Sequence, residues 1–214
     1  MIQDVTTLIP IRLKCPRCGK VFLSSVLTST GSIGIYSDLC QRFIGLNPLP
    51  YLIHTCPYCT FTGYRDEFAK ASFIGNEPLL SDQEFGCKKY EFLAARYANE
   101  NRSPYEIAKV YHMGMCCARL SKDPILESRY LRLAFEWLLK AFKEGVVPEK
   151  EKPVALYLLG EFSRWMGEFD NAIEYYQSVA NQKSADDWLV DLALKQMKFA
   201  KKGDRKLKEL YDNK

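Results

Sequence analysis

The chain has 214 residues, of which 47% are hydrophobic and 26% charged, and its formal net charge is +4. This composition is that of an ordinary folded protein and excludes a disordered or collagen-like chain. No stretch approaches the roughly 20 consecutive apolar residues of a membrane helix. The N-terminus lacks the basic start and apolar run of an export signal. We therefore expect a cytoplasmic protein without membrane insertion, built as one large domain or two small ones.

Four of the eight cysteines form two identical pairs, Cys15-x-x-Cys18 and Cys56-x-x-Cys59. A Cys-x-x-Cys turn points both sulfurs at one centre, and two facing turns supply the four thiolates that suit Zn²⁺. A closed set of four thiolates leaves no open coordination position, so the predicted site is structural rather than catalytic. A rubredoxin-like iron site is the less favoured alternative, because it uses the same ligands. A redox role is disfavoured, since such a motif usually occurs once, at a helix start in a βαβ unit.

The residue after each pair differs between the two turns. Gly19 follows the first pair, where a left-handed backbone conformation costs little for glycine. Thr60 stands at the same place after the second pair. The sequence therefore predicts that the second turn either differs in shape or carries backbone strain.

Basic residues gather around the first pair. Residues 1–60 hold five basic and two acidic side chains. Because Zn²⁺ with four thiolates carries a formal charge of −2, nearby lysines and arginines are explained as its compensation. The alternative is nucleic-acid binding through Arg12, Arg17, Lys20 and Arg42 together with a basic C-terminal helix. From Lys195 onward the chain has eight basic and three acidic residues, although such runs are usually solvent-exposed helix faces.

The segment between the two pairs is predicted to contain strands and loops. Residues 21–27 and 51–55 are rich in β-formers and indicate strands of a zinc ribbon with a long insertion between them. His54 is expected to be a strand side chain rather than a ligand. Cys40 lies in the insertion, and a buried thiol, a replacement ligand and a reactive group all remain open for it, the buried thiol being favoured.

After Phe68 the pattern becomes helical. Ser81 and Ser103 each begin a capping box, and Gly145 and Gly167 fall where helices should end. We expect helices near 82–99, 104–121, 124–144, 153–166, 170–182 and 185–202.

Residues 153–182 show the spacing of a tetratricopeptide repeat, a helix–turn–helix of about 34 residues. Its small residues, Gly160 and Ala172, are expected to let the two helices approach closely. A plain antiparallel bundle is the alternative. The residues expected to line a partner-binding groove, as a speculative assignment, are Glu161, Arg164, Trp165 and Glu168.

Other ionisable residues give no clear active site. His112 and Cys116 are four apart on one helix face, which allows a Cys–His dyad or a second metal site. A packed helix interface is favoured, with Cys87, Cys116 and Cys117 as small core residues. No phosphate-binding glycine loop, dinucleotide fingerprint or serine nucleophile elbow is present.

Taken together and in order, these motifs resemble a prokaryotic family known only as domain of unknown function 2225. The resemblance covers nearly the whole chain. It comprises Cys15-Pro16-x-Cys18-Gly19 with Phe22, Asp38, Cys40, Asn47-Pro48, Tyr51, Cys56-Pro57-x-Cys59, Tyr157-Leu158-Leu159-Gly160-Glu161, Arg164, Gly167 and Ala172. It implies an N-terminal zinc-binding region followed by tetratricopeptide-like helices, and it brings no established activity. The chain departs from the family pattern at Thr60 and around residues 116–120.

The predicted fold is α+β and mostly α. A zinc-ribbon-like domain is expected over residues 1–78 and a tetratricopeptide-like helical domain over 79–214. The predicted function is a non-enzymatic zinc-binding adaptor whose helical groove binds a protein or peptide partner, with nucleic-acid binding as the alternative.

Overall fold

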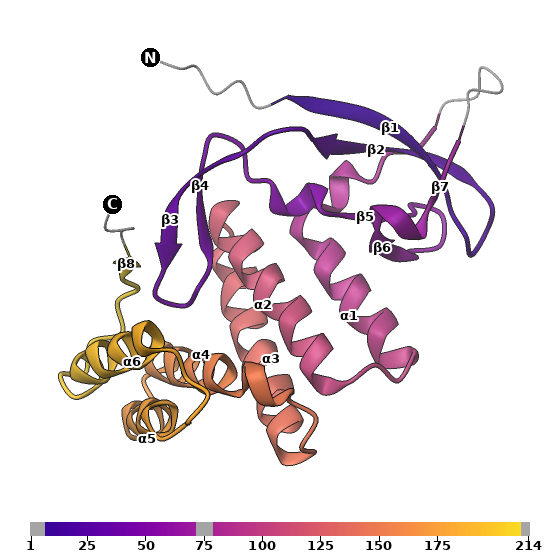
Figure 1. The fold of residues 1–214 in the computed structure, drawn as a ribbon. Coiled ribbons are helices and arrows are strands. Elements are labelled where there is room, and N and C mark those ends of the chain that lie inside the picture. The colour runs from indigo at the N-terminus through magenta and orange to yellow at the C-terminus, as the bar shows by residue number, and fades with distance from the viewer. Residues whose placement is uncertain (1–6, 72–78, 211–214) are drawn as a thin grey trace. The chain divides into compact units, whose positions relative to one another are not determined.

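The computed structural model describes residues 7–71 and 79–210, and it confirms a mixed, mostly helical fold in which small antiparallel sheets precede the helices (Figure 1). The start of the chain, on which the expected lack of an export signal rests, lies outside these ranges. So does residue 78, the expected end of the first domain. The chain forms two compact units. The first comprises Met1–Ser32, Phe43–Arg102 and Val110–Tyr130, and the second comprises Ile33–Arg42, Ser103–Lys109 and Leu131–Lys214.

This division differs from the expected domains 1–78 and 79–214. Helix α1 (Lys89–Asn99) packs on strands β5 (Ile53–Thr55) and β6 (Thr62–Tyr64), so it belongs to the first unit. Residues 33–42, from the insertion between the cysteine pairs, belong to the second unit. Burial of apolar helix faces, rather than sequence order, sets the boundaries.

Two hairpins carry the cysteine pairs. Strands β1 (Leu8–Lys14) and β2 (Val21–Leu27) pair antiparallel from Leu8↔Leu27 to Lys14↔Val21, and β7 (Ala69–Lys70) lines the other edge of β1. The second hairpin pairs β5 with β6, with Thr55 opposite Thr62. The strand expected over 51–55 is shorter than predicted, because Leu49–Tyr51 forms a 3-10 turn with proline inside it.

A small aromatic core lies beneath the hairpin ends. Leu13, Phe22 and Phe68 are buried together with Cys15 and Cys56. The Phe22 and Phe68 rings meet edge to face, with centroids 5.7 Å apart. The cysteine turns are therefore attached to a packed apolar floor.

The remaining elements include the other strands and helices. A second three-stranded sheet has the order β4-β3-β8. Its strands are β3 (Gly31–Tyr36), β4 (Gln41–Ile44) and β8 (Glu209–Leu210); the 3-10 turns are Arg65–Glu67, Gln83–Lys88 and Glu149–Glu151; the other helices are α2 (Pro104–Leu120), α3 (Pro124–Lys143), α4 (Lys152–Met166), α5 (Phe169–Ala180) and α6 (Asp187–Ala200). Among the described residues, no helix is both long and apolar enough to cross a membrane.

The helix predictions agree closely with the structure except at the first start. The capping box at Ser103 is confirmed, because the Glu106 backbone N–H donates to Ser103 Oγ at 3.2 Å and the Ser103 N–H donates to Glu106 Oε2 at 3.1 Å. The box expected at Ser81 does not start a regular helix. Asp82 turns inward to Lys89 instead, and Gly86 breaks the helical backbone with a φ of 48°.

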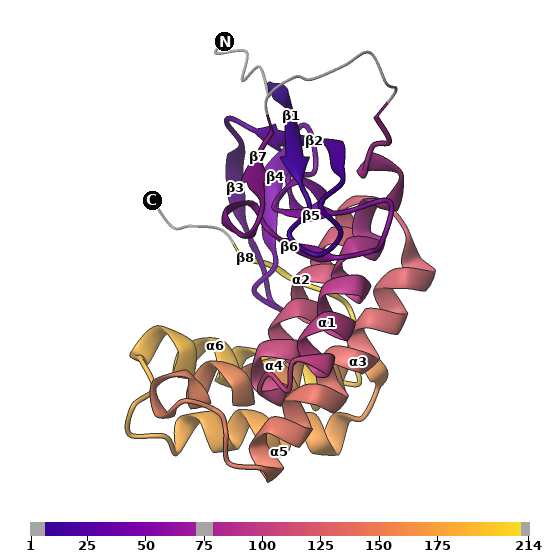
Figure 2. The ribbon, with the colours of Figure 1, turned by 90° about the vertical axis from the view of Figure 1, so that its right-hand side faces the viewer.

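The second unit contains the helical pair α4 and α5, followed by α6 (Figure 2). A Cβ atom added at Gly160 would lie 2.6 Å from a ring carbon of Tyr176, and Ala172 is fully buried. The predicted close approach at these two small residues is thus confirmed. Gly167 ends α4 in a left-handed conformation, with a φ of 88°.

Cys87 and Cys117 form a disulfide across 30 residues of sequence within the first unit. Both residues are buried, as predicted. The expectation that they are small core thiols is wrong in chemical state. Sequence spacing alone did not reveal that the 3-10 turn before α1, which holds Cys87, meets the C-terminal part of α2.

Replacing both cysteines of this disulfide by serine should lower the free energy of unfolding by about 3–4 kcal/mol, the loop-closure value for a separation of 30 residues. Urea denaturation of the double variant beside the oxidised wild type measures this loss, and peptide mapping verifies the linkage. A double variant as stable as the oxidised wild type would contradict the prediction.

Candidate metal centre

The two cysteine turns have the same backbone hydrogen bonds. The N–H of Gly19 donates to the Cys15 carbonyl at 2.9 Å, and the N–H of Thr60 donates to the Cys56 carbonyl at 2.8 Å. The N–H of each first cysteine in turn donates to a carbonyl five residues later, at 2.9 and 2.8 Å. Each turn is closed at both ends, which holds its two sulfurs on one side.

The two turns differ in the conformational strain of the residue that follows the second cysteine. Gly19 has a φ of +72°, and Thr60 has a φ of +57°. The second turn therefore has the same left-handed shape as the first, and its β-branched residue bears the strain that the sequence predicted as one of two possibilities. The Thr60 hydroxyl donates to the Cys59 carbonyl at 2.7 Å, which partly offsets this strain.

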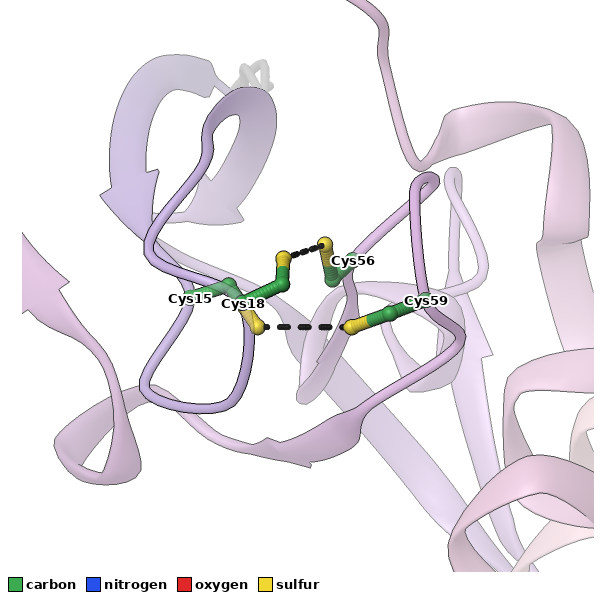
Figure 3. Close-up of side chains that lie close together, drawn as sticks. All are labelled: Cys15, Cys18, Cys56 and Cys59. Carbon is green, nitrogen blue, oxygen red and sulfur yellow. Dashed lines mark hydrogen bonds between the residues drawn. The ribbon is translucent and has the colours of Figure 1, made fainter.

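The four sulfurs converge on one centre (Figure 3). The Sγ atoms of Cys15 and Cys59 are 3.6 Å apart, as are those of Cys18 and Cys56. All four lie within 4.8 Å of one another. These separations are too long for disulfides, whereas Zn–S bonds of about 2.3 Å place tetrahedral sulfurs about 3.8 Å apart. The donor set fits a metal ion held by four thiolates.

The protonation of the thiols differs with depth. Burial raises the pKa of Cys15 and of Cys56, against the opposing effect of backbone N–H groups in each turn. Cys18 is exposed, and the Lys20 backbone N–H lowers the pKa of its thiol to about 7. The deep pair thus resists becoming charged without a cation, so metal binding and thiol deprotonation are coupled.

The basic residues assigned to nucleic-acid binding are divided between the two units. Arg17 and Lys20 are exposed beside the first turn, with the Lys20 ammonium 4.6 Å from the centre of the Tyr58 ring. Arg12 is half-buried. Arg42 belongs to the second unit and pairs with Glu209 at 2.9 Å.

The residues assigned to a partner groove divide into interior and surface positions. Glu161 and Arg164 are fully buried and pair with each other at 2.8 Å, so the assignment of these two to an open groove is wrong in this conformation. Trp165 is half-buried and Glu168 is exposed. The charges of Glu161 and Arg164, read as surface features, instead satisfy each other inside the protein.

The other candidate residues are not members of the four-sulfur group. His54 is buried in the strand position expected for it, and Ser24 Oγ is 2.7 Å from its Nδ1. Cys40 and Cys116 are buried and each is disulfide-bonded, so the buried thiol favoured for Cys40 is wrong in its chemical state. His112 is half-buried. These positions disfavour a substrate-accessible dyad at Cys116.

A buried polar network, which sequence reasoning missed, lies in the first unit. Lys89 Nζ contacts Asp82 Oδ2 at 2.8 Å and also donates to the carbonyl of Pro50 at 3.1 Å. Asp82 Oδ2 is 3.9 Å from His54 Nδ1, the same nitrogen that Ser24 approaches. Burial lowers the pKa of His54 to about 4.

This network is not arranged as a hydrolase triad. Such a triad needs serine and aspartate on opposite nitrogens of the imidazole. Both groups here face Nδ1, and Ser24, His54, Asp82 and Lys89 are at most 2% exposed. The group can position the segment before the second cysteine pair, since the Thr55 N–H donates to Asp82 Oδ2 at 3.1 Å.

Thr60→Gly should stabilise the metal-bound protein by about 1 kcal/mol, because it removes the left-handed strain of a β-branched residue. The matched change Gly19→Ala should destabilise by a similar amount, since space around Gly19 is open and the backbone conformation alone opposes a side chain. Thermal unfolding of both variants beside wild type measures these effects. Equal shifts in one direction would contradict the strain assignment.

One metal ion per chain should be found by native mass spectrometry. A strong chelator should expose four reactive thiols and disorder the hairpin turns, because binding contributes on the order of 10–16 kcal/mol in structural sites of this kind. Cys18→Ser should release metal at chelator concentrations that wild type withstands. The Cys87→Ser, Cys117→Ser double variant serves as control and should retain its metal. A folded wild type that never carries metal would contradict the prediction.

Comparison with known protein families gives a match over most of the chain. A family described as "Uncharacterized protein conserved in bacteria (DUF2225)" matches residues 8–200, which include both cysteine pairs and all six described helices. Searches of the curated proteins and of the solved structures give no match. Because the family model covers most of the chain, this protein belongs to the DUF2225 family of uncharacterized bacterial proteins.

Proposed function

We propose that the protein is a non-enzymatic, cytoplasmic adaptor in which a structural Zn²⁺ holds the cysteine turns and the helices of the second unit bind a protein or peptide partner. The closed set of four sulfurs carries this proposal. With every tetrahedral position filled by the protein, no position is left for water or substrate, so the ion serves architecture. Zinc is favoured over iron because it is the usual ion of structural four-thiolate sites.

The second unit offers a recess for a partner's apolar side chain. It has a volume of about 340 Å³ and lies where the end of α3, the start of α4 and the end of α5 meet. Phe142, Val147 and Leu156 supply apolar walls, and Ser178 and Gln182 supply a polar rim. An apolar floor with a few polar groups is typical of a site that receives one anchoring side chain.

The alternative, nucleic-acid binding, draws on Arg17 and Lys20, which are exposed beside the first cysteine turn. The pairing of Arg42 with Glu209 weighs against it, since that arginine is already neutralised. Binding through phosphates would be strongly weakened by salt.

A photo-crosslinker at Gln182, on the rim of the recess, tests the adaptor proposal in cells. We expect a discrete protein adduct there, and loss of that adduct when Ser178→Trp fills the recess. The same crosslinker at Gln177, which is exposed on α5 and outside the recess, is the matched control. Absence of any protein adduct, together with salt-sensitive retention of RNA or DNA by the purified chain, would overturn the proposal in favour of nucleic-acid binding.

A further inference from the structure

The C-terminal residues of the described chain form an extended tail rather than a continued helix. Helix α6 ends at Ala200, and β8 then pairs antiparallel with β3, with Ile35 opposite Leu210. Ser37 continues this pairing, because its N–H donates to the Lys208 carbonyl at 2.7 Å and its Oγ accepts the Lys208 N–H at 3.2 Å. The tail therefore adds a strand to the edge of β3 within the second unit.

The Arg164 side chain binds the backbone of the same tail. Its Nη1 donates to the carbonyls of Asp204 and Lys206, each at 2.9 Å. The Asp204 carboxylate bends this part of the tail, because its Oδ1 accepts the Lys206 N–H at 2.8 Å, and one guanidinium nitrogen therefore reaches both carbonyls. Arg164 thus recognises main-chain carbonyls of a turn that the Asp204 side chain shapes, and the extended part of the tail follows at residues 208–210.

The guanidinium is held in place from the helix side. Glu161 Oε2 accepts from Arg164 Nη2 at 2.8 Å, and the Tyr176 hydroxyl donates to Glu161 Oε1 at 2.6 Å. Arg164 and Glu161 are at most 2% exposed. Because α4 and α5 fix this charged pair, the donor that faces the tail is preorganised.

Two side chains of the tail add selectivity. Glu209 pairs with Arg42 at 2.9 Å, and Leu210 packs against the buried cluster that includes Tyr157 and Tyr176. The site thus favours an extended segment in which an acidic residue is followed directly by an aliphatic one.

The family match covers the residues that hold the tail but not the tail itself. Ser37, Arg42, Glu161 and Arg164 lie within residues 8–200, which match the family model, whereas the tail at 204–210 lies beyond the match. The residues that hold the tail therefore lie inside the matched region, and the tail itself lies outside it.

We propose that Arg164, Ser37 and the edge of β3 form a receptor for an extended peptide segment, and that the chain's own tail is an internal ligand that a partner segment replaces. The partner is a protein with an extended acidic–aliphatic segment. This inference rests on the proposed adaptor function and names the partner's chemistry and the place where it binds.

A labelled peptide of residues 204–210 tests the proposal by fluorescence anisotropy. It should bind a chain that ends at Gly203 and show at least about tenfold weaker binding to the full chain, whose own tail competes. The peptide Leu210→Ala should bind about tenfold more weakly, since it removes most of a partly buried aliphatic side chain. A folded tail-less chain that ignores the peptide would overturn the proposal.

A charge exchange locates the binding site. Arg42→Glu in the tail-less chain should weaken the wild-type peptide about two- to fivefold, as expected for a partly exposed ion pair, and the peptide Glu209→Lys should recover binding. Lys198→Glu, the same charge change at an exposed position on α6 outside the site, should have no effect. Equal effects of the two protein variants would overturn the assigned register.

A cleavable tail covers the case in which the tail-less chain fails to fold. A protease site placed after Lys202 allows the tail to be cut in the folded full chain. Excess labelled peptide should then exchange with the cut tail, and a tail that never exchanges would overturn the proposal. A further outcome is that the peptide exchanges with the cut tail while the crosslinker at Gln182 captures no protein. That result would support this receptor and contradict the apolar recess as the partner site, so the failures of the two proposals are distinguishable.

Discussion

The convergence of four sulfurs is the constraint on which the first unit depends. Two hairpins that are remote in sequence end in matching turns, and the aromatic core beneath them is small. Burial opposes charge on Cys15 and Cys56, so the arrangement becomes favourable when a cation accepts their thiolates. The same requirement explains why Thr60 tolerates a left-handed backbone, since a different turn would move Cys59 away from the other sulfurs.

Among the described residues, a buried ion pair lies in each unit, and the two pairs have different tasks. In the first unit Lys89 and Asp82 fix the backbone that leads to the second cysteine turn. In the second unit Glu161 orients Arg164 toward main-chain carbonyls. A buried pair costs desolvation and adds little net stability, but removing one partner leaves an uncompensated charge worth about 3–5 kcal/mol of destabilisation. These pairs therefore select one arrangement of the chain around them.

In the proposed function, the metal site and the sites that bind a partner are different parts of the protein. The ion site is closed by protein ligands, whereas the second unit has an apolar recess and a strand edge that reads extended backbone. A tail that occupies this edge makes binding a competition between two segments of similar chemistry. Its strength is set by the difference in their affinities rather than by either affinity alone.

Local sequence patterns determined the two cysteine turns, the left-handed backbone of the glycine and threonine after them, and the helices with the capping box at Ser103. Each of these features depends on residues close in the chain. The close contact at Gly160 followed from repeat spacing in the same way. Only tertiary structure decided that Asp82 pairs with Lys89, that Cys87 bonds Cys117, and that Arg164 faces inward to the tail. Each of these pairs partners from different elements, and a charged or thiol side chain carries no local signal of which distant group will satisfy it once it is buried.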